Sequence, residues 1–297
     1  MFFEERIETP ITGFDTCTAP NAVRCKCTGE RASPYSTRAI KELMHILVTN
    51  DDGVLAPGLL ALAQEMRKLG KVTVLAPDRN WSASGHVKTI DRPLRVKDVI
   101  LADGIPVLAS DGAPSDCVAL ALLGVVTEKV DLVVSGINPN ANIGHDVTYS
   151  GTVTAAMEAV IDGVKGIAVS LDSKPGHGEL DYGPAARVAA RVAVKVMSDG
   201  LPVGVLLSIN VPYLPDEQFK GIQITRQGLR VYRDALDARK DPRGRAYYWI
   251  GGDLPTGIDE AGTDFGALQA GYVSITPLQL DLTARDALEG LKDWKWE

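Results

Sequence analysis

The sequence predicts an α/β protein, in which a mostly parallel, doubly wound sheet carries a layer of helices on each face. Three observations lead to this fold class. Apolar runs typical of strands alternate with helical segments from residue 45 to residue 212. The runs are continuously apolar, as in strands that are covered on both faces. Pro and Gly mark helix starts and ends, as in the segment from Pro57 to Gly70.

The expected strands are short apolar runs that follow one another in a regular order. HILVT is the first, and KVTVLAP, IPVLAS, DLVVSG, GIAVS and GVLLSINVP follow it. They place strands at residues 45–49, 71–77, 105–110, 131–136, 166–170 and 204–212.

Four helical segments separate these strands. PGLLALAQEMRKLG is amphipathic, PSDCVALALLGVV is apolar behind a proline, SGTVTAAMEAVIDG starts with a capping serine, and YGPAARVAARVAVKVMSDG is long and periodic. They place helices at residues 57–70, 114–126, 150–163 and 182–200.

The pattern changes after Pro212. Residues 221–252 read as two strands joined by a long charged connection, and DPRG at 241–244 is a turn signal. We expect a β-hairpin arm at about 222–251, which could reach a neighbouring subunit. A further strand at 271–278 and a closing helix at 284–294 complete the chain.

Composition and charge narrow the class of protein. The chain has 297 residues, of which 45% are hydrophobic and 23% charged, with a net charge of -7 and a pI of about 5.2. This acidity disfavours binding to a nucleic-acid polymer or to an anionic membrane. No apolar run is long enough to span a bilayer, and the N-terminus does not resemble a secretory signal. We therefore expect a cytoplasmic protein.

Residues 1–43 differ from the rest and are expected to form a flexible N-terminal extension, with Met44 as a candidate translation start. Cys17, Cys25 and Cys27 match no common zinc or disulfide spacing, so we interpret them as incidental thiols. Cys117 lies in an apolar helical stretch and is expected in the core.

Polar residues follow the strands of the predicted sheet, at the edge where ligands bind in doubly wound folds. Asp51 and Asp52 are adjacent, and their mutual repulsion suggests a cation between them. Oxygen ligands of this kind suit Mg²⁺, Mn²⁺ or Ca²⁺. The residues at this edge are Asn50, Asp51, Asp52, Gly53, Asp78, Arg79, Ser82, Ser84, Ser135, Asn138, Asn142, Asp146, Tyr149, Ser150, Gly151 and Thr152.

Each of these signals has a simpler structural explanation. The aspartates could cap a helix or a turn, and Ser82 and Ser84 could be ordinary loop residues. Ser150 or Thr152 could be a plain helix cap or could help a helix N-terminus to hold an anion. His86 and His145 are more readily structural than catalytic. The functional interpretation depends on the convergence of these residues at one edge. Dinucleotide, P-loop and nucleophile-elbow motifs are absent from the sequence.

Seven sequence blocks carry a resemblance to a known family. They are ILVTNDDG, APDRNWSASG, DGAPSDCV, VSGINPNANIGHDVTYSGTVTAAMEA, ITRQGLRVY, DPRGRAYYWIGG and GYVSITPL. Together they resemble the SurE (survival protein E) family of metal-dependent nucleoside 5′-monophosphate phosphatases, from residue 44 to about 285.

The resemblance implies a Rossmann-like catalytic domain at 44–297 that hydrolyses nucleoside 5′-monophosphates to nucleoside and inorganic phosphate, as a 5′-nucleotidase. It implies one divalent cation per subunit, Mg²⁺ or Mn²⁺, and a homodimer or homotetramer with exchanged or interlocked C-terminal segments. The implied catalytic residues are Asp51 and Asp52, the implied metal ligands are Asp51, Asp52, Ser82 and Asn138, and the implied phosphate-binding residues are Asn50, Gly53, Ser150, Gly151 and Thr152.

The chain departs from the family pattern at Ala113, where Thr is common, at Asn140, where Gly is common, and in its N-terminal extension. For the reaction, we favour attack by a metal-bound water with an aspartate as base, and an aspartyl-phosphate route stays open. The nucleoside is expected to bind between the sheet edge and the arm, near Tyr232, Arg239, Arg243, Tyr247 and Tyr248 of this chain or of a neighbour.

Two other classes of function are compatible with the fold. One is a nucleotide-binding regulatory or scaffold protein without catalysis, against which the intact set of Asp51, Asp52, Ser82 and Asn138 argues. The other is a sugar-nucleotide transferase, which would release no inorganic phosphate from a monophosphate.

Overall fold

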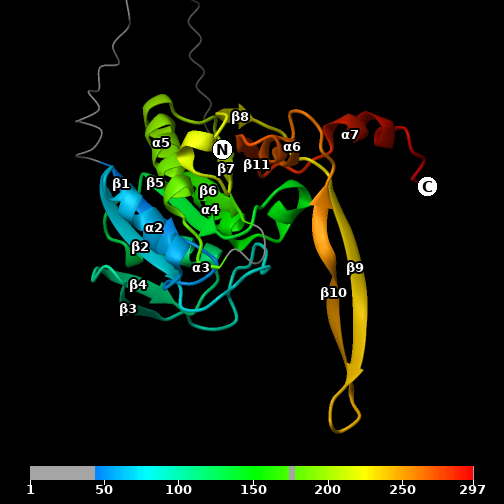
Figure 1. Cartoon of the computed structure of the whole chain (residues 1–297), viewed down its shortest axis with the longest axis horizontal. Helices are drawn as coiled ribbons and strands as arrows, with labels where there is room; N and C mark the ends of the chain where they lie inside the picture. The colour runs from blue at the N-terminus through cyan, green and yellow to red at the C-terminus, as the bar shows by residue number, and fades with distance from the viewer. Residues whose placement is uncertain (1–43, 174–177, 297) are drawn as a thin grey trace, which may run out of the picture. The chain divides into compact units, whose positions relative to one another are not determined.

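The computed structural model describes residues 44–173 and 178–296 (Figure 1). The extension at 1–43, with Cys17, Cys25 and Cys27, lies outside the described residues. Within the described part of the chain, no helix combines the length and the apolar character that crossing a membrane requires.

A nine-stranded sheet forms the centre of the fold, in the order β3-β4-β2-β1-β5-β6-β7-β11-β8. Most neighbours are parallel; β3 runs antiparallel to β4, and β11 runs antiparallel to β7. The mostly parallel α/β sheet predicted from the sequence is therefore confirmed. The strands are β1 (His45–Thr49), β2 (Lys71–Pro77), β3 (Val96–Ile100), β4 (Pro106–Ser110), β5 (Leu132–Asn138), β6 (Lys165–Asp172), β7 (Val205–Pro212), β8 (Ile222–Ile224) and β11 (Val273–Gln279).

Helices cover both faces of this sheet (Figure 1). Apolar residues of α2 (Pro57–Met66) and α5 (Gly183–Asp199) pack on one face, and those of α3 (Pro114–Leu120) and α4 (Gly151–Ile161) pack on the other. Cys117 is fully buried in the second cluster, which confirms its expected place in the core. The other helical segments are η1 (Ala121–Val125), η2 (Gly144–Thr148), η3 (Asp216–Gln218), α6 (Asp264–Gln269) and α7 (Arg285–Lys292).

Several elements differ from the sequence prediction. The helix expected at 114–126 is regular only to Leu120, because Gly124 adopts a φ of 124° inside the π-helical turn η1. The edge strand β3 and the short helix α6 were not expected. β3 has exposed residues and lacks the continuous apolar run of the buried strands, which explains why the pattern missed it.

The hairpin consists of β9 (Arg230–Lys240) and β10 (Ala246–Gly257), which form a separate two-stranded antiparallel sheet. The expected long charged connection is instead a tight turn at 241–245. Its Asp241 carboxylate accepts hydrogen bonds from the backbone N–H groups of Arg243 and Arg245. Residues 222–224, placed in the arm by the sequence pattern, pair with β11 in the large sheet as β8. The hairpin extends beyond the helices of the sheet in Figure 1.

The strand order places a switch point at the centre of the sheet. β1 pairs with β2 on one side and with β5 on the other, so the chain leaves β1 and β5 at adjacent positions on the carboxyl edge. Connections diverge at such a point and leave room for a ligand. Asp51 follows β1, and Asn138 is the last residue of β5.

Candidate active site

The loop after β1 is folded by its own side chains. The Asn50 carboxamide accepts a hydrogen bond from the Gly53 N–H at 3.2 Å and donates one to the Gly53 carbonyl at 3.0 Å. Gly53 has a φ of 105°, and a Cβ there would lie 3.2 Å from the Arg79 backbone. Glycine is therefore required at residue 53, and Asn50 shapes the loop that presents the two aspartates. Whether Asn50 and Gly53 also contact a phosphate stays a prediction.

The Asp51 carboxylate lies against the start of α4. Thr152 donates a hydrogen bond from its hydroxyl to Oδ1 of Asp51 at 2.5 Å. A Cβ on Gly151 would lie only 2.7 Å from the Cβ of Asp51, so this close approach requires glycine. Burial raises the pKa of Asp51, and the Thr152 hydroxyl with backbone N–H groups at the start of α4 opposes that rise. The helix N-terminus therefore fixes Asp51 in place.

Asp52 lies beside Asp51 in a poorly solvated position. Burial, followed by the charge of Asp51, raises the pKa of Asp52 from 3.8 to about 7. No Lys, Arg or His within the described residues forms an ion pair with either carboxylate. Two adjacent acids without a protein cation form a site that a bound divalent cation would stabilise.

A cavity of about 610 Å³ opens beside Asp51. This volume is in the range of pockets that bind small molecules. Three of the predicted metal ligands, Asp51, Ser82 and Asn138, line it, together with Ser150. Its remaining lining residues are Ala83, Asn140, Ala141, Asn142, Asp146, Tyr149, Asp172, Ser173, Arg230, Pro255, Thr256, Phe265 and Gln269.

The oxygen atoms of Ser82 and Asn138 are available for a cation. Asn138 donates from Nδ2 to the Asn140 carbonyl at 2.5 Å, and its Oδ1 accepts no hydrogen bond from the described residues. The Ser82 hydroxyl is exposed and forms no hydrogen bond there, while the Ser82 N–H donates to Asn80 Oδ1 at 2.7 Å. Ala83 has a φ of 59°, an uncommon conformation of the kind that gathers at functional sites.

The chemistry of these donors fits a hard divalent cation. Two carboxylates, a hydroxyl and an amide oxygen are ligands for Mg²⁺ or Mn²⁺ and would suit zinc poorly. The described residues contain no cluster of three or more His, Cys, Asp or Glu side chains in a metal-binding arrangement. The candidate site has only two acids, and its other two donors are a hydroxyl and an amide oxygen.

The predicted phosphate-binding residues divide into two groups. Ser150 is the N-cap of α4, and its Oγ accepts a hydrogen bond from the Val153 N–H at 3.1 Å. Its own hydroxyl proton stays available to a ligand in the cavity. Gly151 and Thr152 contact Asp51 instead and do not line the cavity. The sequence pattern thus located the helix cap, but not the contact between α4 and Asp51.

The far wall of the cavity comes from the base of the hairpin and from α6. Arg230 Nε donates to Asp146 Oδ2 at 2.7 Å, and the Tyr232 hydroxyl donates to Asp146 Oδ1 at 2.5 Å. Phe265 and Gln269 of α6 line the cavity and were missed by the sequence analysis, which did not expect this helix. Only their position in the folded chain reveals them.

The expected nucleoside-pocket residues are only partly near the cavity. Tyr232 reaches its rim through Asp146. Arg239, Arg243, Tyr247 and Tyr248 are exposed on the outer hairpin and do not line the cavity of their own chain. Their expected contribution from this chain is therefore wrong, because β9 and β10 carry them away from the sheet edge. A contribution from a neighbouring copy stays a prediction.

Comparison with known proteins identifies the family. The family model of survival protein SurE matches residues 46–234. The chain belongs to the SurE family. The match spans the sheet from β1 to β8 and reaches into β9 of the hairpin, so it includes all four candidate metal ligands.

Relatives and solved structures agree with this membership. A 5′-nucleotidase SurE of Chloroflexus aggregans is 51% identical over 254 residues, which is 86% of this chain and 100% of the relative. A 5′-nucleotidase SurE of Herpetosiphon aurantiacus is 54% identical over 255 residues, covering 85% and 99% of the two chains. The crystal structure of the SurE protein from Aquifex aeolicus matches with a TM-score of 0.70 and 39% identity, over 84% of this chain and 98% of that one.

Two of the three departures from the SurE pattern, Ala113 and Asn140, lie in the described part of the chain. Ala113 precedes α3 without a side-chain cap, and Asp116 Oδ2 accepts the Ala113 N–H at 2.9 Å instead. Asn140 lines the cavity and accepts a hydrogen bond from Asn138 through its backbone carbonyl. That backbone contact does not depend on the side chain at 140.

Proposed function

We propose that this protein hydrolyses nucleoside 5′-monophosphates to nucleoside and inorganic phosphate with one bound Mg²⁺ or Mn²⁺ per subunit. The observation that carries the proposal is the unpaired carboxylate couple of Asp51 and Asp52 beside a cavity that Ser82 and Asn138 also line. The relatives named 5′-nucleotidase SurE support the proposed phosphatase activity. Residues 44–297 are the proposed catalytic domain.

The residues of the site have different proposed roles. Asp51, Asp52, Ser82 and Asn138 would hold the cation, which neutralises phosphate charge and lowers the pKa of a bound water. Thr152 fixes the Asp51 carboxylate, which lines the cavity, so that it needs no reorganisation during the reaction. The Ser150 hydroxyl would donate a hydrogen bond to a phosphate oxygen, because its Oγ accepts from the Val153 N–H and its own proton has no partner among the described residues. One of the two aspartates takes the proton from the attacking water.

The cavity can also accommodate the nucleoside. Beyond Ser150 its wall contains Tyr149 and Phe265, which offer aromatic surface to a base. Arg230 and Asp146 hold the hairpin base against this wall through a half-buried ion pair. We assign the phosphate to the Asp51 side of the cavity and the nucleoside to the side of α6 and the hairpin base.

Phosphate release from nucleoside 5′-monophosphates tests the proposal directly. The purified protein is expected to release inorganic phosphate from a panel of these substrates only when Mg²⁺ or Mn²⁺ is present. Chelation should remove the activity and added metal should restore it. A protein that binds nucleotide but releases no phosphate with either metal would be a binding protein, and the proposal would fail.

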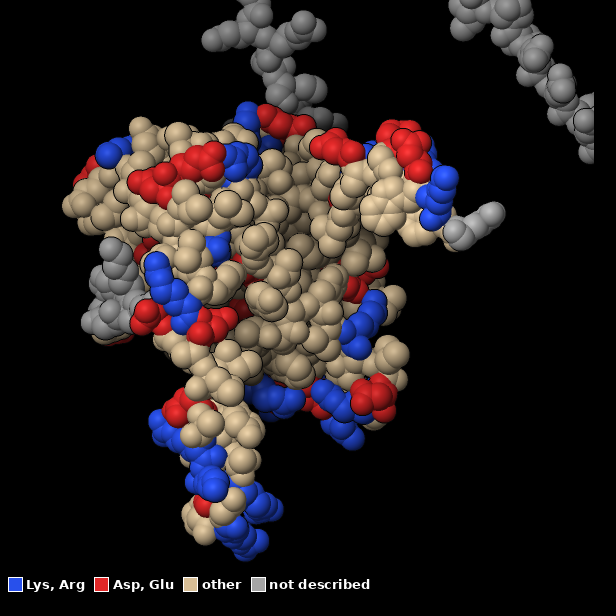
Figure 2. Space-filling model, turned by 90° about the vertical axis from the view of Figure 1, so that its right-hand side faces the viewer, with Lys and Arg blue, Asp and Glu red and all other residues tan. Residues whose placement is uncertain are grey.

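We also propose that the protein is a homodimer or homotetramer in which the hairpin contacts another copy. Leu236 pairs with Ile250, and Ala238 pairs with Tyr248, so these side chains share one face of the hairpin. Leu236, Tyr248 and Ile250 are 67%, 62% and 85% exposed. An apolar face of this kind is unusual on an unpartnered surface. Lys and Arg accumulate toward the tip of the hairpin, as Figure 2 shows.

Charges on the apolar face are expected to reduce the oligomeric state. The double variant Leu236→Asp and Ile250→Asp changes only exposed side chains, so the fold should be retained. Its molar mass by light scattering should fall relative to the unaltered protein. The control Asp237→Asn lies on the opposite hairpin face and should keep the original mass. An unchanged mass in the double variant would rule out this face as the interface.

A further inference from the structure

The long connection between β2 and β3, residues 78–95, contains Ser82 and no helix or strand; we call it the Ser82 loop. A ligand on such a segment keeps its position only if other residues hold the backbone. Long irregular loops in compact domains are commonly functional. The contacts that hold this loop are therefore part of the site.

Glu158 of α4 is buried and faces this loop. Its side chain is 3% exposed, and its two oxygens have different partners: Oε2 contacts His86 Nε2 and Oε1 contacts Lys88 Nζ, both at 2.8 Å. A buried carboxylate is unfavourable unless it is paired in this way. Glu158 has no role in the proposed reaction, so the reaction does not explain why an acid is buried at this position.

Two further groups near α4 hold the same part of the loop. The Thr154 hydroxyl donates to the Gly85 carbonyl at 3.1 Å. The Gly85 N–H donates to the Tyr149 carbonyl, just before α4, at 3.0 Å. Residues 85–88 therefore lie along α4, with Glu158 binding the side chains of His86 and Lys88.

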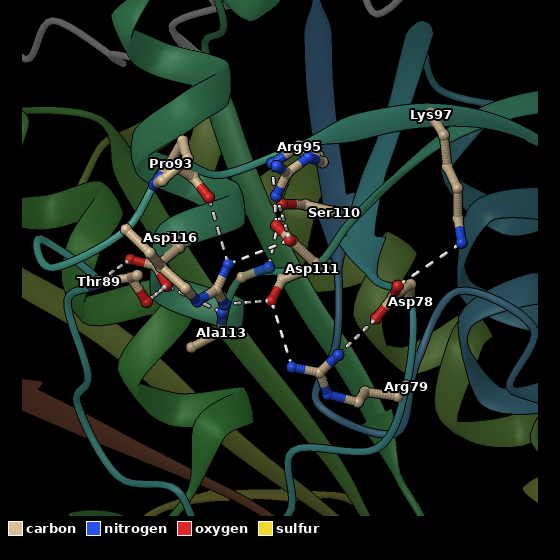
Figure 3. Close-up of polar contacts among 12 residues, drawn as sticks. Asp78, Arg79, Thr89, Pro93, Arg95, Lys97, Ser110, Asp111, Ala113 and Asp116 are labelled. Atoms are coloured by element: carbon tan, nitrogen blue, oxygen red, sulfur yellow. Dashed lines mark hydrogen bonds and ion pairs between the residues drawn. The ribbon is translucent and has the colours of Figure 1, made fainter.

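The rest of the loop is anchored to β4 and α3, as Figure 3 shows. Asp116 accepts the Thr89 N–H at 2.8 Å and the Thr89 hydroxyl at 2.7 Å. Asp111 pairs with Arg92 at 3.0 Å. These contacts fix the loop after residue 88. Before Ser82, the Trp81 N–H donates to the Asp51 carbonyl at 2.7 Å, so the contacts along α4 hold the segment that follows Ser82.

Helix α4 contacts both Asp51 and the Ser82 loop. Its first turn holds Asp51 through Thr152, and Glu158 lies six positions later, which is about 9 Å along a helix axis. We propose that Glu158 is a positioning residue, which fixes the Ser82 loop relative to Asp51 and so sets the geometry of the cation ligands. This inference rests on the proposed metal-dependent function.

The first test compares Glu158→Gln with the control Glu128→Gln. Glu128 pairs with Lys71 on the surface and touches no part of the site. The affinity for Mn²⁺ is measured by calorimetry without substrate, and amide hydrogen exchange of the Ser82 loop is measured on the metal-free protein. Glu158→Gln is expected to weaken Mn²⁺ binding at least about tenfold and to accelerate exchange in residues 82–88. The control should change neither.

A double-mutant cycle shows whether the effect passes through Ser82. In a Ser82→Ala background, Glu158→Gln should have little further effect on Mn²⁺ affinity, because the ligand that it positions is gone. An equal loss in both backgrounds, or wild-type affinity in Glu158→Gln, would overturn the inference. Lys88→Met, whose side chain is largely exposed, provides a second variant if Glu158→Gln does not fold, and it should weaken binding in the same direction.

The same measurements separate this inference from the proposed function. If the unaltered protein binds no Mn²⁺ and releases no phosphate, the proposed function fails. If the unaltered protein does both and Glu158→Gln matches it in affinity and exchange, only the positioning role fails.

Discussion

Asp51→Asn should lose metal-dependent phosphate release by about a thousandfold or more, which corresponds to roughly 4 kcal/mol of transition-state stabilisation. The substitution removes one of two charges that would hold the cation. It keeps an acceptor oxygen for the Thr152 hydroxyl and preserves the shape of the side chain. Activity and Mn²⁺ affinity should therefore fall together, while the helix contact persists.

In the absence of metal, Asp51→Asn should not lose stability, in contrast to its loss of activity. Asp51 is 3% exposed, and its charge is buried next to Asp52 without a protein cation. Removing it should leave the free energy of unfolding unchanged or increase it, as measured by denaturant unfolding. Asp98→Asn, on the exposed part of β3, is the control and should leave activity intact. Full activity in Asp51→Asn would contradict the ligand assignment.

Mn²⁺ binding should weaken as the pH falls below about 7. In the metal-free protein, burial and the charge of Asp51 raise the pKa of Asp52 to about 7. A cation binds the ionised carboxylate, so protons compete with the metal below that pKa. We expect the affinity to fall up to about tenfold per pH unit below 7, with close to one proton released per ion at pH 6. Calorimetry in two buffers of different ionisation enthalpy measures both quantities.

The same pKa predicts how the metal-free protein responds to pH. Asp52 has a pKa of about 7 when folded and 3.8 as the unperturbed reference, so the folded state binds the proton more tightly. This contribution to stability is complete below pH 3.8 and is lost as the pH rises toward 7, by at most ~4 kcal/mol. Asp52→Asn should abolish this loss and reduce the pH dependence of Mn²⁺ affinity, with Asp51 as the remaining titrating ligand. Affinity independent of pH between 5.5 and 7.5 would contradict the prediction.

Much of the fold could be predicted because its signals are local. Continuous apolar runs located β1, β2 and β5, and parallel strands bring their following loops to one edge. That is why Asp51, Ser82 and Asn138 could be grouped from the sequence, and the structure places all three on one cavity. The edge strand β3 was missed because its exposed residues interrupt the apolar pattern on which the prediction depends. β8 was placed in the hairpin arm because its pairing with β11 joins residues far apart in the chain.

The supporting contacts of the site could not be predicted in the same way. Thr152 reaches Asp51 across 101 positions, and Glu158 reaches His86 across 72. Nothing in the local sequence distinguishes Glu158 from an ordinary helical acid, or Phe265 from an ordinary apolar residue. For the hairpin, the turn could be predicted from the sequence, but its direction away from the cavity could not.

The sequence by itself determined the class of fold, the edge of the sheet at which the chemistry lies and the oxygen-rich character of that edge. Periodicity and residue type are properties of short segments, and they decide which elements form and what their ends carry. Only the tertiary structure decided which side chains meet: α4 holding both Asp51 and the Ser82 loop, and α6 closing the cavity. Such contacts join residues far apart in the chain, and packing selects them after the local elements have formed.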